Sequence, residues 1–160
     1  MTDIEGKTAS GIYFRKTSTP HSRDALVLVM GYAGSGRIWP RGFVDKLAQK
    51  YAVGTYDNRG TGYSIVPQDP REYTIKKMSD DLDEVVDQLR IGQLHLLGYS
   101  MGSCIALQYA HDHAAKVKTL FLLSGLPAVR RMSGRALRCP RRLLTRKTIR
   151  FGTCTCPHSS

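Results

Sequence analysis

The stretch Leu94–Gly102, LHLLGYSMG, decides the fold. Its first four residues are an apolar run of strand length, and residues 101–110 (MGSCIALQYA) are apolar on almost all sides, which is typical of a buried helix. Between the two, Gly98 and Gly102 flank Ser100. Glycines lack a Cβ and relieve crowding where a strand turns sharply into a helix. The stretch therefore predicts a tight turn that holds Ser100 clear of a sheet.

Strands and helices alternate on both sides of this turn. Ala25–Met30 (ALVLVM) is fully apolar, as expected of a central parallel strand that is covered on both faces. Apolar residues recur at steps of three and four from Ile75 to Leu89, which predicts an amphipathic helix. The alternation predicts an α/β fold with a mostly parallel central sheet and helices on both faces. Further strands are expected at Gly11–Lys16, Tyr51–Tyr56 and Val117–Leu123, and a further helix near Trp39 and Pro40.

The net charge of +11 is concentrated at one end of the chain. Residues 127–160 contain nine basic residues and no acidic one, whereas residues 1–126 are nearly balanced. The apolar periodicity also stops after Leu126. We therefore expect a folded core over residues 1–126 and a basic tail over 127–160. A disordered tail, an alternative exon or an unintended reading frame would each explain this composition.

The rest of the composition excludes several classes of protein. The N-terminus is polar and acidic, unlike a secretory signal, and no apolar run has the length of a membrane helix. Three of the four cysteines lie in the tail, so we expect a reducing cytosol rather than a disulfide framework. We expect no cofactor and no metal, because the spacing of Cys139, Cys154, Cys156 and His158 does not match a zinc site.

Three motifs occur in one order along residues 6–126. The apolar strand ending at Met30 runs into Gly31-Tyr32, the segment Asp57–Ser64 reads DNRGTGYS, and Gly98-Tyr-Ser100-Met-Gly102 follows. Together they resemble the oxyanion segment, the Asp-x-Arg-Gly-x-Gly-x-Ser turn and the nucleophile elbow of the α/β-hydrolase family. The resemblance implies the N-terminal part of that fold, truncated after the strand that follows the nucleophile helix.

The family resemblance also implies a role for each motif. Ser100 would attack an acyl carbonyl, and the backbone N–H groups of Tyr32 and Met101 would bind the developing oxyanion. Met30 stands where relatives often have histidine, which the backbone donors tolerate. The resemblance further implies structural roles, with acid and base bracing a tight loop beside the site, for Asp57, Arg59, Gly60 and Gly62, and close-packing roles for Gly31, Gly98 and Gly102.

The base and the acid that a serine nucleophile needs have no evident counterpart. Asp112, with His111 and His113 beside it, lies at the far end of the helix that begins after Ser100, and a helix of twelve residues spans about 18 Å. His158 has no acid before it in the tail, and His21 and His95 are expected to be packing or surface residues. The sequence thus predicts an impaired serine hydrolase of ester-like bonds (carboxylic ester, thioester, lactone or amide). An inactive fragment or pseudoenzyme is the alternative, and whether the chain is an enzyme stays open here.

Two other functions fit the sequence less well. Glycines at 31, 34 and 36 follow a strand, as in a dinucleotide-binding unit, but their order is the reverse of that fingerprint. The basic tail could neutralise phosphates, but it holds a single aromatic residue, so we expect no specific nucleic-acid partner and no membrane partner. The expected partner is a small ester-like substrate. Self-association is also expected, through an unpaired edge at Val117–Leu123.

Overall fold

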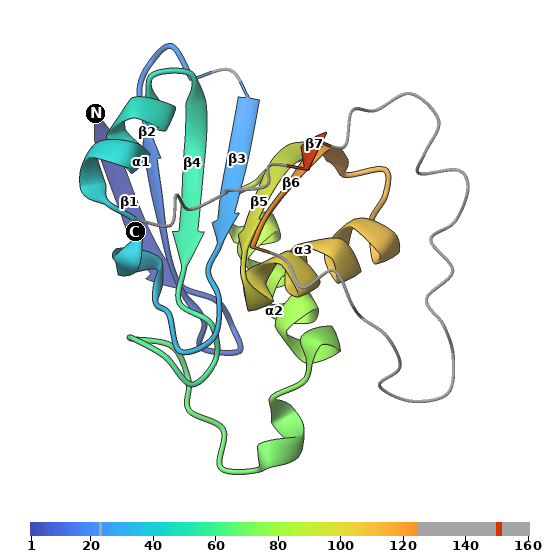
Figure 1. The fold of residues 1–160 in the computed structure, drawn as a ribbon. Coiled ribbons are helices and arrows are strands. Elements are labelled where there is room, and N and C mark those ends of the chain that lie inside the picture. The colour runs from blue at the N-terminus through green and yellow to red at the C-terminus, as the bar shows by residue number, and fades with distance from the viewer. Residues whose placement is uncertain (23, 125–149, 152–160) are drawn as a thin grey trace, which may run out of the picture.

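A computed structural model describes residues 1–22, 24–124 and 150–151. Within them, one seven-stranded sheet has the order β1-β2-β4-β3-β5-β6-β7 (Figure 1). The strands are β1 (Thr2–Lys7), β2 (Tyr13–Ser18), β3 (Asp24–Val29), β4 (Tyr51–Tyr56), β5 (Leu94–Tyr99), β6 (Val117–Leu123) and β7 (Arg150–Phe151). The helices are α1 (Arg41–Ala48), α2 (Ile75–Gln88) and α3 (Met101–Asp112), with short 3-10 helices η1 (Gly36–Ile38) and η2 (Pro70–Glu72).

The sheet is mostly parallel, as predicted. All pairs from β4 through β3, β5 and β6 to β7 are parallel, and only β1–β2 and β2–β4 are antiparallel. Helices α1, α2 and α3 connect β3 to β4, β4 to β5 and β5 to β6, in the alternation expected of parallel crossovers. Strand β2 begins two residues later than predicted, and β1 lies at an edge where the residues show no apolar alternation.

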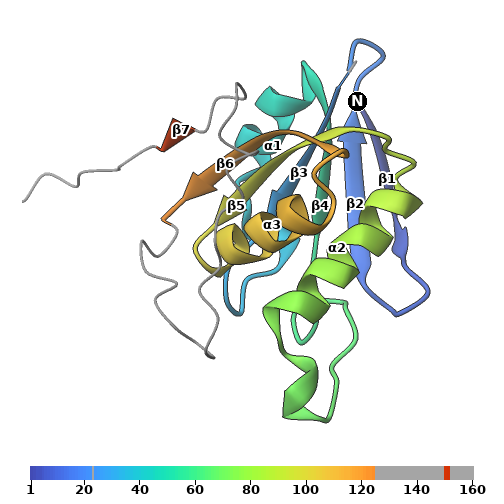
Figure 2. The same ribbon diagram turned by 90° about the vertical axis from the view of Figure 1, so that its right-hand side faces the viewer.

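Helices cover both faces of the sheet. Residues of α2 and α3, among them Leu82, Val85 and Ile105, form the larger apolar cluster with one face (Figure 2). Val44 and Ala48 of α1 form a second cluster on the opposite face. Strand β3 lies between the two clusters, with Val27 and Val29 in the first and Leu26 and Leu28 in the second. This double coverage explains why the strand is apolar at consecutive positions.

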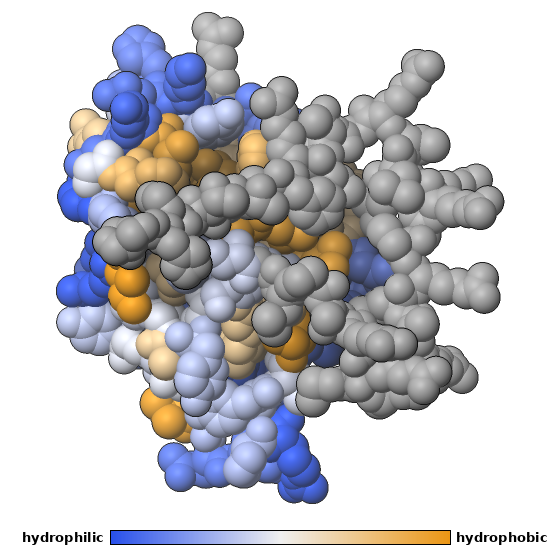
Figure 3. Space-filling model, viewed as in Figure 1, coloured by the Kyte–Doolittle hydropathy of each residue, from blue (hydrophilic) through white to orange (hydrophobic). Residues whose placement is uncertain are grey.

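On the face of the sheet that carries α1, the hydropathy of the surface differs from one side of the sheet to the other. Hydrophilic residues dominate the β1 side, whereas apolar residues gather toward the middle of the view, over β5 and β6 (Figure 3). Leu97 of β5 pairs in register with Phe121 of β6, so both side chains lie on this face. Leu97 also packs against the cluster beneath α1.

The predicted unpaired edge at β6 is wrong at two positions. Phe121 pairs with Arg150 and Leu122 pairs with Phe151, in parallel register. The unpaired N–H and C=O groups of an edge strand can form hydrogen bonds with the backbone of an added strand. This pairing does not require apolar periodicity in the added strand. The remainder of the predicted tail, residues 127–149 and 152–160, lies outside the described residues, so the domain boundary near 126 stays a prediction.

The core predicts a contrast between two leucines on neighbouring helices. Leu82 of α2 is 0% exposed, whereas Leu107 of α3 is 39% exposed. Leu82→Ala is expected to lower the free energy of unfolding by about 2–5 kcal/mol, because it leaves a cavity. Leu107→Ala is expected to cost less than about 1 kcal/mol. Urea unfolding followed by far-UV circular dichroism measures both, and equal losses would contradict the placement of Leu82 in the core.

Candidate active site

The turn between β5 and α3 is tight and strained at Ser100. Ser100 has φ 54° and ψ −123°, a combination that non-glycine residues rarely adopt. Its N–H donates to Leu123 O at 2.9 Å. Ser103 Oγ donates to Gly98 O at 2.9 Å and to Leu123 O at 3.1 Å. These bonds fasten both sides of the turn to the end of β6, and they hold Ser100 in the strained conformation.

The two glycines of the turn occupy positions that have no room for a side chain. A Cβ on Gly98 would lie 2.5 Å from Gly102 O and 2.7 Å from Ser103 Cα. A Cβ on Gly102 would overlap the carbonyl oxygen of Val29, at the end of β3. The start of α3 is therefore packed directly against the backbone of β5 and β3. This is the physical reason for the spacing that the sequence shows.

The segment after β3 runs beside Ser100. A Cβ on Gly31 would lie 2.9 Å from Ser100 Cβ and 3.4 Å from Ser100 Oγ. Tyr32 follows Gly31, and Met101 is the first residue of α3. Within the described residues, the N–H groups of Tyr32 and Met101 form no hydrogen bond. At a helix N-terminus such an N–H is a ready donor to an anion.

Asn58 fixes this segment, a role that was not predicted from the sequence. Its Nδ2 donates to Met30 O at 2.9 Å and to Gly31 O at 3.4 Å, and the side chain is buried. Thr61 Oγ1 donates to Asn58 O at 2.8 Å. The only sequence signal for Asn58 was its place between Asp57 and Arg59 in the loop motif.

Asp57 joins two loops through backbone hydrogen bonds. Its Oδ1 accepts from Gly36 N at 2.7 Å, and its Oδ2 accepts from Tyr63 N at 2.9 Å. The residue is 1% exposed. Gly62 has φ 53°, and a Cβ there would overlap the Asp57 carboxylate. These contacts favour the structural interpretation of Asp57 and Gly62.

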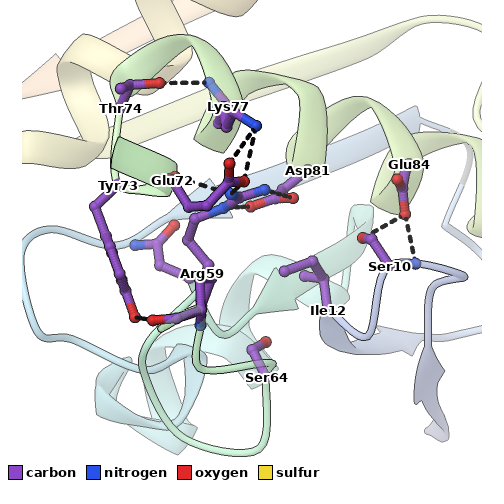
Figure 4. A network of polar contacts seen from close by, with 12 residues as sticks. Ser10, Ile12, Arg59, Ser64, Glu72, Tyr73, Thr74, Lys77, Asp81 and Glu84 are labelled. Carbon is purple, nitrogen blue, oxygen red and sulfur yellow. Dashed lines mark hydrogen bonds and ion pairs between the residues drawn. The ribbon is translucent and has the colours of Figure 1, made fainter. Parts of the chain in front are cut away.

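Arg59 makes its contacts with α2 and η2, and the structural role expected for it stays a prediction. Its guanidinium binds Asp81 of α2 through two hydrogen bonds of 2.7 Å, and its Nη1 donates to Glu72 Oε2 at 3.2 Å (Figure 4). Backbone N–H groups already occupy the Asp57 carboxylate, so Arg59 is free to pair elsewhere. The Asp81 hydrogen bonds raise the pKa of Arg59.

Gly60 lets the loop pass under an aromatic ring. It has φ 79°, and a Cβ at this position would lie 2.6 Å from Tyr73 Cε1. Tyr73 Oη donates to Pro67 O at 3.0 Å, which holds the ring across the loop (Figure 4). The loop from Asp57 to Tyr73 is thus tied to the segment after β3 by Asn58, to η1 by Asp57 and to α2 by Arg59.

Within the described residues, no histidine or carboxylate is hydrogen-bonded to Ser100. Asp112 stays at the far end of α3, where His111 Nδ1 at 3.0 Å and Gln108 hydrogen bond to it and lower its pKa to about 2. His113 stacks on Tyr109 at the same end. Burial lowers the pKa of His95, which lies against Tyr51 of β4. Within residues 1–22 and 24–124, Ser100 Oγ has no hydrogen-bond partner. His158 lies outside the described residues.

The described residues hold no cluster of three or more His, Cys, Asp or Glu side chains arranged for a metal ion. The cysteines and the histidine that were weighed for zinc, Cys139, Cys154, Cys156 and His158, lie outside them. No helix in the described part of the chain is long and apolar enough to cross a membrane.

Comparison with known proteins agrees with this geometry. The family model of the alpha/beta hydrolase fold matches residues 24–138. The chain belongs to the α/β-hydrolase family. The resemblance and the fold class predicted from the three motifs are therefore confirmed, including the parallel sheet with helices on both faces.

Several of the similar proteins are named as hydrolases, of different kinds. RutD of Caulobacter vibrioides, named as a carbamate hydrolase, is 35% identical over 120 residues, which are 74% of this chain and 44% of RutD. A marine microorganism esterase is 27% identical with a TM-score of 0.64, covering 71% of this chain and 41% of the esterase. The epoxide hydrolase CorEH is 25% identical with a TM-score of 0.72, covering 90% of this chain and 49% of CorEH. The chain spans less than half the length of these proteins.

The packing of the turn predicts opposite effects for two glycine substitutions. Gly98→Ala is expected to lower the free energy of unfolding by at least about 2 kcal/mol, because the new methyl group meets backbone atoms that cannot move aside. Gly42→Ala, in α1, meets nothing within 4 Å. It is expected to raise stability by about 0.5–1 kcal/mol. Thermal unfolding measures both, and a Gly98→Ala chain as stable as wild type would contradict the close packing of the turn.

The buried ion pair of Arg59 predicts a larger loss of stability on substitution than the exposed ion pair of Arg71. Arg59→Met is expected to lower the free energy of unfolding by about 3–5 kcal/mol, because the buried Asp81 loses its cation. Arg71→Met is the matched control, since Arg71 pairs with Asp69 but its side chain is 89% exposed. We expect it to change stability by less than about 0.5 kcal/mol. Adding Asp81→Leu to Arg59→Met should restore part of the loss, and failure to do so would contradict an unpaired Asp81 as its cause.

Proposed function

We propose that the chain is a serine hydrolase of ester-like bonds, with Ser100 as the nucleophile. The observation that carries the proposal is the strained conformation of Ser100 between β5 and α3, with the Gly31 backbone beside its hydroxyl. A strained turn of this kind raises a nucleophile above the sheet, and such strain persists only where the surroundings enforce it.

The same geometry supports an oxyanion hole. The N–H groups of Tyr32 and Met101 are donors without partners in the described residues, one in the segment beside Ser100 and the other at the start of α3. In the proposed step, Ser100 Oγ attacks the carbonyl carbon and these two groups bind the oxygen that becomes negative. The loss of one such donor typically costs about 100- to 1,000-fold in rate.

Turnover also needs a base for the Ser100 proton and an acid that orients the base. Within the described residues, the histidines lie at the far end of α3, on β5 and after β2, and none is hydrogen-bonded to Ser100. We therefore propose that this chain by itself is an impaired hydrolase. The alternative is a pseudoenzyme that keeps the fold and has no turnover.

The proposed substrates are small molecules with an ester, thioester, lactone, amide or carbamate carbonyl. RutD is named as a carbamate hydrolase and the marine protein as an esterase, and both names support this class. A serine at the turn disfavours epoxide opening, for which the family uses an aspartate. We propose no specific nucleic-acid or membrane partner, and a cytosolic location stays a prediction.

The proposal predicts weak hydrolysis of p-nitrophenyl acetate. We expect a rate at most about 1,000- to 10,000-fold above the reaction with water, because the oxyanion donors act without the base. Ser100→Ala should lower this rate, because Ser100 Oγ no longer attacks, and only the part that the oxyanion donors support alone should remain. Ser18→Ala, at the end of β2, should leave it unchanged.

Two outcomes would each contradict one part of the proposal, the first the role of Ser100 and the second the impairment. Equal rates for wild type and Ser100→Ala would favour the pseudoenzyme. A turnover near the common enzyme value of about 10 per second that depends on Ser100 would show that residues outside the described ones supply the acid and the base.

A further inference from the structure

A cavity apart from Ser100 lies on the α1 face, between β2, β4 and the segment from η1 to α1. Its volume is about 260 Å³. Every charged residue in its lining is an arginine, and these arginines come from β2, η1 and α1. The lining consists of Arg15, Thr17, Gly36, Arg37, Trp39, Arg41, Val44 and Thr55.

The carboxylates near these arginines lie outside the lining. Arg41 donates through Nε to Asp45 and through Nη1 to Asp3. Within the described residues, its Nη2 group has no carboxylate partner. Arg15 Nη2 lies 3.6 Å from Glu5 Oε2, beyond hydrogen-bond distance. These acids pair with two of the guanidinium groups, Arg41 through hydrogen bonds and Arg15 at longer range, and they are not part of the cavity lining.

Arg37 has no carboxylate partner within the described residues. Its guanidinium lies over the ring of Tyr63, 4.7 Å from the ring centroid. Stacking fixes the plane of the group, and a hydrogen bond with the Tyr13 side chain, which raises the pKa of Arg37, uses part of its edge. Arg37 is therefore the arginine of the lining that forms no ion pair with a carboxylate within the described residues.

Trp39 adds an unused donor and an apolar wall. Its Nε1 is buried and has no hydrogen-bond partner. Its ring stacks on Phe43 and meets Tyr99 edge-on. A buried indole N–H normally has a partner, whereas this one has none within the described residues, and what Trp39 offers the cavity is its apolar ring.

We propose that this cavity binds a small molecule with a phosphate group. Guanidinium groups from three elements suit an oxyanion with several acceptor oxygens, and Arg forks match phosphate geometry well. A volume of about 260 Å³ exceeds that of phosphate alone, so an apolar group can lie against Trp39 and Val44. The site is separate from Ser100 and does not rest on the proposed hydrolase activity.

The fluorescence of Trp39, the sole tryptophan of the chain, reports on this cavity directly. The full chain is titrated at constant ionic strength with inorganic phosphate, phenyl phosphate, benzoate and chloride. We expect a saturable change with both phosphates, tighter for phenyl phosphate, and none with chloride. No saturation by either phosphate up to about 10 mM would overturn the proposal. Benzoate binding as tight as phenyl phosphate would overturn the assignment to phosphate.

Three variants locate the binding. Arg37→Gln and Arg15→Gln are each expected to weaken phenyl phosphate binding about tenfold or more, because a charge-assisted hydrogen bond is lost. Arg71→Gln removes the same charge at an exposed position outside the lining, and it should leave the affinity unchanged. Far-UV circular dichroism checks that each variant is folded. Folded Arg37→Gln and Arg15→Gln chains with wild-type affinity, or an equal loss in Arg71→Gln, would place the ligand elsewhere.

Discussion

The two hydrogen bonds accepted by the Asp57 carboxylate hold the candidate active site together. One joins Asp57 to Gly36 and the other joins it to Tyr63, so a single buried side chain sets the distance between the loops that follow β3 and β4. A carboxylate shielded from water binds N–H groups strongly, and a neutral side chain would give weaker bonds. The position of the segment beside Ser100 depends on this contact.

The neighbours of Asp57 extend the same constraint in two directions. Asn58 holds the carbonyl groups of Met30 and Gly31, which lie just before the proposed donor Tyr32. Arg59 reaches the other way and binds Asp81 on α2. Three consecutive residues thus join the segment after β3, η1 and α2 to one loop. The side chain at each position makes a different contact, and none could replace another.

The sequence predicted the parts of the fold that depend on local pattern. The apolar run Ala25–Met30 and the periodic helix from Ile75 to Leu89 differ from the observed elements by one residue at their ends. Strand β1 was missed because it is an edge strand with mostly exposed residues, so burial imposes no alternation on it. The role of Asn58 and the pairing of Arg59 with Asp81 were also missed. Both depend on partners more than twenty residues away, which no local pattern records.

The hydrogen bond from Ser100 N to Leu123 O sets an order of events in folding. Leu123 ends β6, the strand that follows α3, so the chain must form α3 and return to the sheet before this bond exists. Strain at Ser100 has no compensation until then, and a strained backbone relaxes when its supports are absent. We therefore expect Ser100, the proposed nucleophile, to reach its strained geometry only after β5 and β6 have paired. In a growing polypeptide, this geometry would then begin with the arrival of a strand rather than with the synthesis of the serine.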